Sequence, residues 1–347
     1  MAEAKCITII GGGLAGLTLG IALRQRGVSI TVCESGNYPR HRVCGEFISG
    51  RGQATLARLG LHKGLFDQTG AVRARTMAFF SATKSTKPRL LPAPAICLSR
   101  FVLDAALAKI FRELGGEFHE GERFAGDFAE GIVRATGRRV RTEAGGPRWF
   151  GLKIHARNIP LVADLEMHVS PRGYIGLCRI NGGEVNVCGL FRQAAAENVE
   201  AKNRHELLHG QPGSPLRQRL AHAEFDESSF CAVAGLSLRP QPAETRAELC
   251  IGDAITMIPP ITGNGMSMAF ESAELAVAPL LAWSRGESSW QEARNKIARD
   301  CDAAFARRLA WAKWLQGIIL TPALQNPIVA LASRSACLCR LAFERTR

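Results

Sequence analysis

The first 34 residues place two short apolar runs around a glycine-rich turn and a helix, and this order constrains the fold more than any other feature of the chain. The segments Lys5–Ile10 and Val28–Cys33 are rich in β-branched residues and predict buried strands. Between them, Gly11–Gly16 breaks the first run, and Leu17–Arg26 has apolar residues at helical spacing. Strand, turn, helix and strand within about 30 residues predict a βαβ unit with parallel strands.

The turn reads Gly-Gly-Gly-Leu-Ala-Gly and matches the pattern G-x-G-x-x-G. In this pattern the first glycine permits a tight turn, the second lets the backbone approach a pyrophosphate, and the third lets the helix pack against the strand. The start of the helix offers free N–H groups to phosphates. Glu34, which ends the second strand, is placed to accept hydrogen bonds from a ribose diol. The predicted dinucleotide contacts here are Gly11, Gly13, Leu14, Ala15, Gly16, Glu34 and Ser35. A plain turn without a ligand is the alternative.

A second glycine-rich segment lies late in the chain. The segment Glu248–Ile251 predicts a buried strand and runs into Gly252 and Asp253. Two prolines follow, and then an apolar helix is predicted over Gly263–Leu281, with two further glycines at its start. An aspartate at a strand end can bind sugar hydroxyls, and a helix start stabilises a group that gains negative charge.

With these two segments in this order, the chain resembles the flavoprotein superfamily that includes p-hydroxybenzoate hydroxylase and geranylgeranyl reductase, from Cys6 to about Leu281. The resemblance implies FAD as cofactor and NAD(P)H as a candidate electron donor. It implies a flavin contact for Arg100, which begins a helix predicted over Arg100–Leu114, and a place near the reactive face of the flavin for Cys44. The other residues assigned to the cofactor are Arg42, Gly252, Asp253, Pro260, Gly263, Asn264, Gly265 and Met266.

The chain departs from the superfamily at several motifs. Ala135-Thr136-Gly137 stands roughly where hydroxylases carry Asp-Gly, and the halogenase motif Trp-x-Trp-x-Ile-Pro is absent. The pair Cys44-Gly45 resembles the reductases. We therefore expect reduction or dehydrogenation of a hydrophobic, isoprenoid- or polyketide-type substrate by hydride transfer at flavin N5. An FAD-dependent aromatic or polyketide monooxygenase is the alternative, and a non-catalytic flavin electron carrier is the alternative from another class.

The order of elements predicts an α/β protein, with a Rossmann-like FAD domain interrupted by a mostly antiparallel sheet domain and followed by helices. The expected boundaries are 1–72 with 98–145 and 246–285 for the FAD domain, 73–97 with 146–245 for the substrate domain, and 286–347 for the helical segment. Alternation in Gly151–His155 puts Lys153 and His155 on one face of a strand. Lys153 is the second candidate catalytic residue, because it could neutralise a reduced flavin or an anionic substrate; a solvent-facing lysine is the more ordinary expectation. His155 is expected to be a satisfied residue of the sheet.

Composition narrows the partners. The net charge is +13, but only two tyrosines are present and the basic residues do not interleave with aromatic ones, which argues against a nucleic-acid platform. Eleven cysteines without a C-x-x-C pair predict neither a metal site nor a disulfide framework, and favour a cytoplasmic location. The N-terminus does not resemble a signal peptide, and no uninterrupted run of 18 apolar residues predicts a spanning helix. Tryptophans and basic residues in Trp311–Phe343 suit either a peripheral membrane contact or packing onto the FAD domain. The oligomeric state is not predicted.

Overall fold

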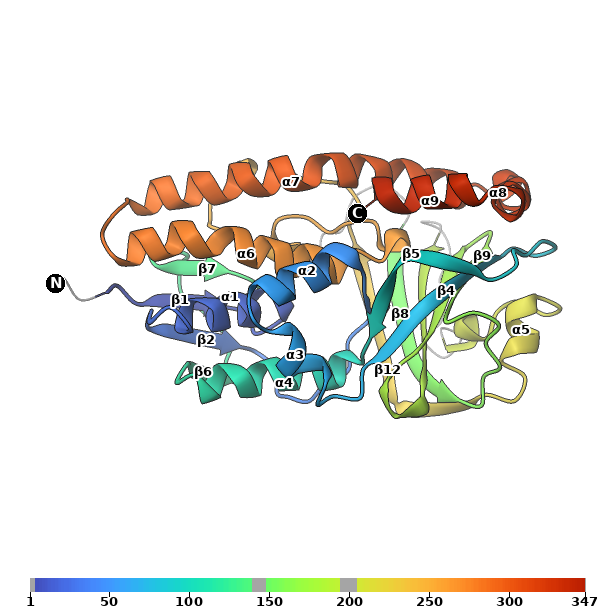
Figure 1. The fold of residues 1–347 in the computed structure, drawn as a ribbon, viewed down its shortest axis with the longest axis horizontal. Coiled ribbons are helices and arrows are strands. Elements are labelled where there is room, and N and C mark those ends of the chain that lie inside the picture. The colour runs from blue at the N-terminus through green and yellow to red at the C-terminus, as the bar shows by residue number, and fades with distance from the viewer. Residues whose placement is uncertain (1–3, 139–147, 194–204, 347) are drawn as a thin grey trace.

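The computed structural model describes residues 4–138, 148–193 and 205–346. A small parallel sheet with its helices occupies one end of the molecule, and a larger sheet occupies the other (Figure 1). A long C-terminal helix runs over the first part and reaches the second, where two shorter helices follow it. This is the α/β architecture that the sequence predicts.

The parallel sheet is built around the predicted βαβ unit. Its strand order is β6-β2-β1-β7, and every pair is parallel. The strands are β1 (Ile7–Ile10), β2 (Ile30–Glu34), β6 (Glu117–Glu120) and β7 (Ile132–Arg134). Helix α1 (Leu14–Arg24) connects β1 to β2 and is buried over almost its whole length, because it packs against both α4 and α6.

The strand predicted over Glu248–Ile251 is wrong in extent. Only one isolated parallel bridge forms there, between Arg134 and Cys250, beside the edge strand β7. Two backbone hydrogen bonds support it, one to Leu249 and one from Ile251. The chain then turns at Gly252, whose φ of 61° ends the extended conformation before a ladder can develop.

The larger sheet has the order β12-β8-β11-β10-β9-β4-β5-β3 and is antiparallel except where β4 meets β9. Its strands are β3 (Phe47–Ile48), β4 (Val72–Phe80), β5 (Arg89–Cys97), β8 (Arg148–Arg157), β9 (Leu165–Ser170), β10 (Gly173–Arg179), β11 (Val185–Gln193) and β12 (Glu224–Leu236). The sequence predicts extended segments over Arg73–Ala82, Leu90–Leu98 and Trp149–Phe191, and these correspond to β4, β5 and β8 to β11. The sequence did not predict β12, whose polar first half lacks an alternating pattern and whose pairing with β8 is broken by register shifts.

The remaining helices are α2 (Gly50–Arg58), α3 (His62–Phe66), α4 (Arg100–Glu113), α5 (Pro215–Arg219), α6 (Gly265–Ser284), α7 (Trp290–Ile319), α8 (Pro322–Arg334) and α9 (Ala336–Arg345). Short 3-10 turns lie at Asn181–Gly183, His205–His209, Ala243–Thr245, Gly252–Ala254 and Pro260–Thr262. The sequence predicts that Pro322 and Pro327 divide the C-terminal segment into short helices. Pro322 begins α8, but Pro327 lies inside that helix and does not divide it.

Helix α7, from its start to Arg308, is fixed to the first part of the molecule. Ser289 and Glu292 form a capping box that starts α7. Cys301 and Phe305 of α7 belong to the same hydrophobic core as β1 and α1. Arg308 forms a buried, two-point ion pair with Glu271 of α6, at 2.7 and 2.8 Å. In the described part of the chain no single helix is long and apolar enough to cross a membrane; only α7 and α8 together, bent by 108°, reach that length and composition.

Candidate active site

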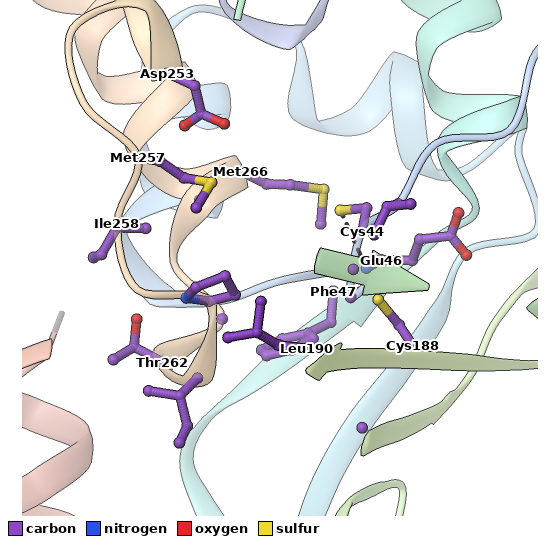
Figure 2. A pocket seen from close by; sticks show the side chains of 18 of the residues that line it. Cys44, Glu46, Phe47, Cys188, Leu190, Asp253, Met257, Ile258, Thr262 and Met266 are labelled. Atoms are coloured by element: carbon purple, nitrogen blue, oxygen red, sulfur yellow. Dashed lines mark hydrogen bonds between the residues drawn. The ribbon is translucent and has the colours of Figure 1, made fainter. Parts of the chain in front are cut away.

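One cavity of about 1320 Å³ lies between the two sheets and the C-terminal helices. Most of the residues predicted from the sequence meet in its wall, although they come from three distant parts of the chain. Those that line it are Gly11, Gly13, Leu14, Ala15, Glu34, Ser35, Arg42, Cys44, Arg100, Asp253, Pro260, Gly263, Gly265 and Met266. Those that lie behind the wall are Gly16, Lys153, Gly252 and Asn264. Figure 2 shows Asp253 and Met266 from the late segment facing Cys44 across the cavity.

The three glycines of the early turn have different surroundings. A Cβ on Gly11, where φ is 111°, would lie 2.3 Å from the carbonyl oxygen of Ala135. A Cβ on Gly16 would lie 2.0 Å from the carbonyl oxygen of Gly11, so the helix can approach the strand only without a side chain there. A Cβ on Gly13 would meet no atom within 4 Å, and this residue lines the cavity. The structure therefore gives each glycine the surroundings that a dinucleotide-binding turn requires.

Glu34 lies at the end of β2, beside this turn. Its carboxylate accepts hydrogen bonds from the N–H groups of Gly12 and Gly36, at 2.9 and 3.0 Å. The guanidinium of Arg40 pairs with it at 2.6 Å, and that of Arg42 lies 3.6 Å away. Burial opposes ionisation of Glu34, but the two arginines outweigh it, so the pKa is lowered. The side chain is thus an ionised acceptor, as a ribose contact needs.

The late turn is held against the early one. Gly252 is so close to α1 that a Cβ would lie 2.9 Å from the Cβ of Ala15. This contact brings Asp253 into the cavity near the early glycine-rich turn. Burial raises the pKa of Asp253 to about 6, although Arg138 and Arg100 both act in the opposite direction. A carboxyl group that is costly to ionise alone gains from a ligand whose hydroxyl groups donate hydrogen bonds to it.

The start of α6 closes the same side of the cavity. Gly263 has a φ of 63°, and a Cβ there would lie 1.9 Å from the ring of Phe47. Asn264 is buried; its amide oxygen accepts a hydrogen bond from Ser49 at 3.2 Å, and its amide nitrogen donates to the carbonyl oxygen of Thr346. Asn264 therefore ties the loop to the C-terminus and does not line the cavity.

Arg100 and Cys44 lie next to each other on the cavity wall. The guanidinium of Arg100 binds both carboxylate oxygens of Asp104, at 2.6 and 2.8 Å, and is only 12% exposed. Sequence alone would equally allow a solvated arginine in the first turn of this helix, and the structure does not show one. Burial raises the pKa of the Cys44 thiol, and the nearby Arg100 only partly offsets this. Cys44 is therefore a protonated thiol near neutral pH, which suits packing or proton donation and not nucleophilic attack.

Glu46 is a candidate site residue that the sequence interpretation missed. It is fully buried and has a left-handed backbone, with a φ of 57°. One carboxylate oxygen accepts the backbone N–H of Arg100 at 2.9 Å, and the other lies 2.7 Å from Nε2 of His155. Strained backbone at a non-glycine residue persists where the surroundings impose it, often at functional sites. An available signal was the pair Lys153 and His155 on one buried strand face, which calls for an opposing carboxylate.

Lys153 is fully buried, so the expectation of a solvent-facing side chain is wrong. Its Nζ lies 3.0 Å from Nδ1 of His41 and 3.7 Å from the Glu46 carboxylate. Burial, together with Lys153 and His155, lowers the pKa of His41 to about 4, so its neutral ring can accept a hydrogen bond from the ammonium group. His41 and Glu46 line the cavity whereas Lys153 does not, so Lys153 can act on a ligand only through them. The prediction of a shared face with His155 is confirmed, because both side chains reach Glu46.

The far end of the cavity is apolar. The larger sheet and the C-terminal helices supply its wall, including Met77, Phe79, Met167, Leu190, Leu315 and Ile318. A single chamber thus joins a polar end, where the two glycine-rich turns meet, to an apolar end of the kind that holds hydrophobic small molecules.

Comparisons with known proteins agree with this arrangement. A family model described as an NAD(P)-binding Rossmann-like domain matches residues 9–47. In structure, the chain is similar to the flavin-dependent brominase Bmp2, with 18% identity and a TM-score of 0.68 over 96% of this chain and 94% of that one. It is also similar to PqsL of Pseudomonas aeruginosa, a probable FAD-dependent monooxygenase, with 17% identity and a TM-score of 0.69 over 94% and 99%. The chain has the fold of flavin-dependent monooxygenases and halogenases.

Two further similarities bear on the cofactor and on length. The halogenase PltM, solved in complex with phloroglucinol and FAD, is 16% identical, with a TM-score of 0.71 over 98% of this chain and 85% of that one. A curated relative, Conditioned medium factor receptor 1 of Dictyostelium discoideum, is 22% identical in an alignment of 330 residues that covers 79% of this chain. The match covers 63% of that relative's length.

Proposed function

We propose that the protein is an FAD-dependent monooxygenase acting on a hydrophobic substrate of aromatic or polyketide type. The observation that carries the proposal is the continuous cavity, whose polar end is lined by both predicted flavin segments and whose wall continues into an apolar end beyond them. The structural neighbours are named as a monooxygenase and halogenases, and so favour oxygen chemistry. The reduction that we expected from Cys44-Gly45 and the motif departures becomes the alternative.

The residues present fit FAD. The open side of Gly13 and the N–H groups at the start of α1 suit the pyrophosphate, and the ionised Glu34 suits the adenosine ribose. Asp253 suits the ribityl hydroxyls. The start of α6, at Gly265, suits the pyrimidine edge of the ring, because a helix N-terminus stabilises negative charge. Bound and reduced FAD would supply the activation of molecular oxygen.

The protein's own contribution is to position the substrate, to exclude water and to hold protons. Helices α7 to α9 supply part of the apolar wall, and a hydrophobic substrate bound against this wall would displace water from the reacting atoms. The protonated thiol of Cys44 lies on the wall beside Arg100. In the net reaction O2, NAD(P)H, a proton and the substrate give a hydroxylated product, NAD(P)+ and water. The segment Ala135-Thr136-Gly137 lines the cavity next to Gly11, at the position where hydroxylases have Asp-Gly. The experiment below therefore also tests whether NADH or NADPH reduces the flavin directly.

The purified protein should release FAD, and not FMN, on denaturation. After reduction under anaerobic conditions by NADH, NADPH or dithionite, admission of ¹⁸O₂ with an aromatic or polyketide substrate should put one labelled oxygen atom into the product. Anaerobic reduction of an unsaturated hydrophobic acceptor would identify a reductase, and oxidation by a protein acceptor alone would identify an electron carrier. A protein that cannot be reconstituted with FAD would overturn all three assignments.

Removal of the Asp253 carboxylate tests the cofactor assignment. Asp253→Ala should weaken FAD binding about tenfold or more, since a hydrogen bond to a charged group contributes about 1.5–3 kcal/mol. Because ionised Asp253 is the better acceptor and its pKa is about 6 without ligand, wild-type affinity should rise as the pH increases from below to above that value. Asp253→Asn should remove this pH dependence. Equal affinities of the three proteins in a flavin fluorescence titration would show that Asp253 does not bind the cofactor.

A further inference from the structure

The exposed hydrophobic side chains of the described residues gather on the C-terminal helices. Six large hydrophobic side chains among these residues are exposed, and four of them lie on the C-terminal helices. They are Trp314 on α7, Leu324 and Leu331 on α8, and Leu341 on α9, with exposed fractions of 58%, 41%, 54% and 41%. A fifth, Leu90, is 79% exposed and lies on β5. Soluble proteins rarely leave such a group together unless it meets a partner or a membrane.

These side chains belong to one surface. Trp314 and Leu324 line the same shallow hollow between α7 and α8. The turn from β4 into β5 and the start of β5, which carries Leu90, contact α8 through two hydrogen bonds, from Ser81 to Asn326 at 2.7 Å and from Arg89 to the carbonyl of Ser333 at 2.6 Å. Figure 1 shows α8 and α9 together at one end of α7, above β5. We call this surface, made of α7 from Arg307 onward, α8, α9 and residues 81–90, the C-terminal face.

The charge of the C-terminal face is strongly one-sided. From residue 303 to the end, the sequence has seven basic residues and one acidic residue, Glu344. Arg308 is buried against Glu271, but Arg307, Lys313, Arg334 and Arg340 are exposed, and so are Lys84 and Lys87 in the turn from β4 into β5. A tryptophan and leucines among lysines and arginines match the interface of an anionic bilayer, whose headgroups attract basic residues while the acyl region takes the apolar ones.

The cavity reaches this surface. Trp314, Leu331 and Leu341 are exposed, and the same three residues line the cavity. They come from three different helices, so the apolar end of the chamber opens where α7, α8 and α9 meet. A hydrophobic molecule leaving a bilayer would enter the chamber there without crossing water.

We propose that the C-terminal face docks on anionic phospholipid membranes and admits the substrate from the bilayer. Docking itself follows from the exposed residues and charges; only the route of the substrate rests on the proposed function. A bilayer explains the observations better than a protein partner, because it accounts for the basic residues, the exposed tryptophan and the apolar mouth together.

Flotation of the full-length protein with vesicles tests the proposal. It should float with vesicles of phosphatidylcholine and phosphatidylserine, and much less with phosphatidylcholine alone. Lys313→Glu with Arg334→Glu should weaken partitioning at least about 30-fold, since each basic residue near an anionic surface contributes about 1 kcal/mol. Trp314→Ser with Leu331→Ser should also weaken it. Matched controls are Lys63→Glu on α3 and Val162→Ser, which is 50% exposed away from the face.

The outcomes separate docking from catalysis. Equal flotation with both vesicle types, or with wild-type protein and all variants, would overturn the proposal. So would concentration-dependent self-association without lipid that Trp314→Ser abolishes, because a second copy would then cover the face. Flotation does not depend on catalytic activity, so it survives a failure of the monooxygenase assignment. If both hold, turnover of vesicle-borne substrate should fall in the charge variant while turnover of detergent-dispersed substrate should not.

Discussion

Replacing Glu46 with alanine is expected to lower the free energy of unfolding by about 3–5 kcal/mol, the cost of removing one partner of a buried ion pair. Glu46 and Lys153 are both fully buried, and Nζ of Lys153 lies 3.7 Å from the carboxylate. Without Glu46, the ammonium group keeps the neutral ring of His41 but loses its nearby carboxylate, while Nε2 of His155 and the N–H of Arg100 lose their acceptor. Urea unfolding of the FAD-free protein, followed by circular dichroism, measures the loss.

Three variants show which part of the loss comes from charge. Glu46→Gln keeps the size and an acceptor, so it should cost less than alanine. Lys153→Met, added to Glu46→Ala, removes the uncompensated charge and should recover much of the stability. Glu46→Gly also relieves the strain of the left-handed backbone, whose φ is 57°. Its free energy of unfolding should therefore be about 1 kcal/mol higher than that of Glu46→Ala. If the free energy of unfolding of Glu46→Ala lies within about 1 kcal/mol of the wild-type value, the buried network does not stabilise the loop that carries Glu46.

The sequence predicts well what is decided locally. The βαβ unit follows from unambiguous strand and helix patterns and from Gly16, whose close contact is with Gly11 in the same turn. Gly252 extends this across the chain, because it contacts Ala15 and so joins the two motifs. The strand predicted at Glu248–Ile251 also failed for a local reason. The chain turns at Gly252 after a single bridge to Arg134, so no ladder forms.

The network behind the cavity could not be predicted in the same way. His41 and Glu46 lie in the segment before β3, whereas Lys153 and His155 lie on β8, more than 100 residues later in the chain. Their contact depends on how the larger sheet packs against residues 41–47, which no periodicity reveals. The usual behaviour of lysine suggested exposure for Lys153, and the buried carboxylate opposite reverses that expectation. Strand β12, which pairs with β8 on its other side, was missed for the same lack of a regular pattern.

The glycines of the early turn should separate cofactor binding from folding. Gly13→Val should leave the FAD-free fold nearly unchanged, because a Cβ there meets no atom within 4 Å and its φ of −77° and ψ of −172° suit any residue. The added side chain points into the cavity where the backbone must approach a pyrophosphate. FAD affinity should therefore fall about a hundredfold or more, a loss of at least about 2.7 kcal/mol.

Gly16→Ala is the matched control, and its expected result is the opposite. Alanine inside a helix is ordinarily more favourable than glycine by about 1 kcal/mol, so propensity alone predicts a more stable protein. Here a Cβ would lie 2.0 Å from the carbonyl oxygen of Gly11, and α1 would have to move away from β1. The melting temperature of the FAD-free protein should drop for Gly16→Ala and stay near the wild-type value for Gly13→Val, with FAD affinity measured by fluorescence titration of the folded fraction. Wild-type FAD affinity in Gly13→Val would mean that no phosphate lies at this turn, and the dinucleotide assignment of the early motif would be wrong.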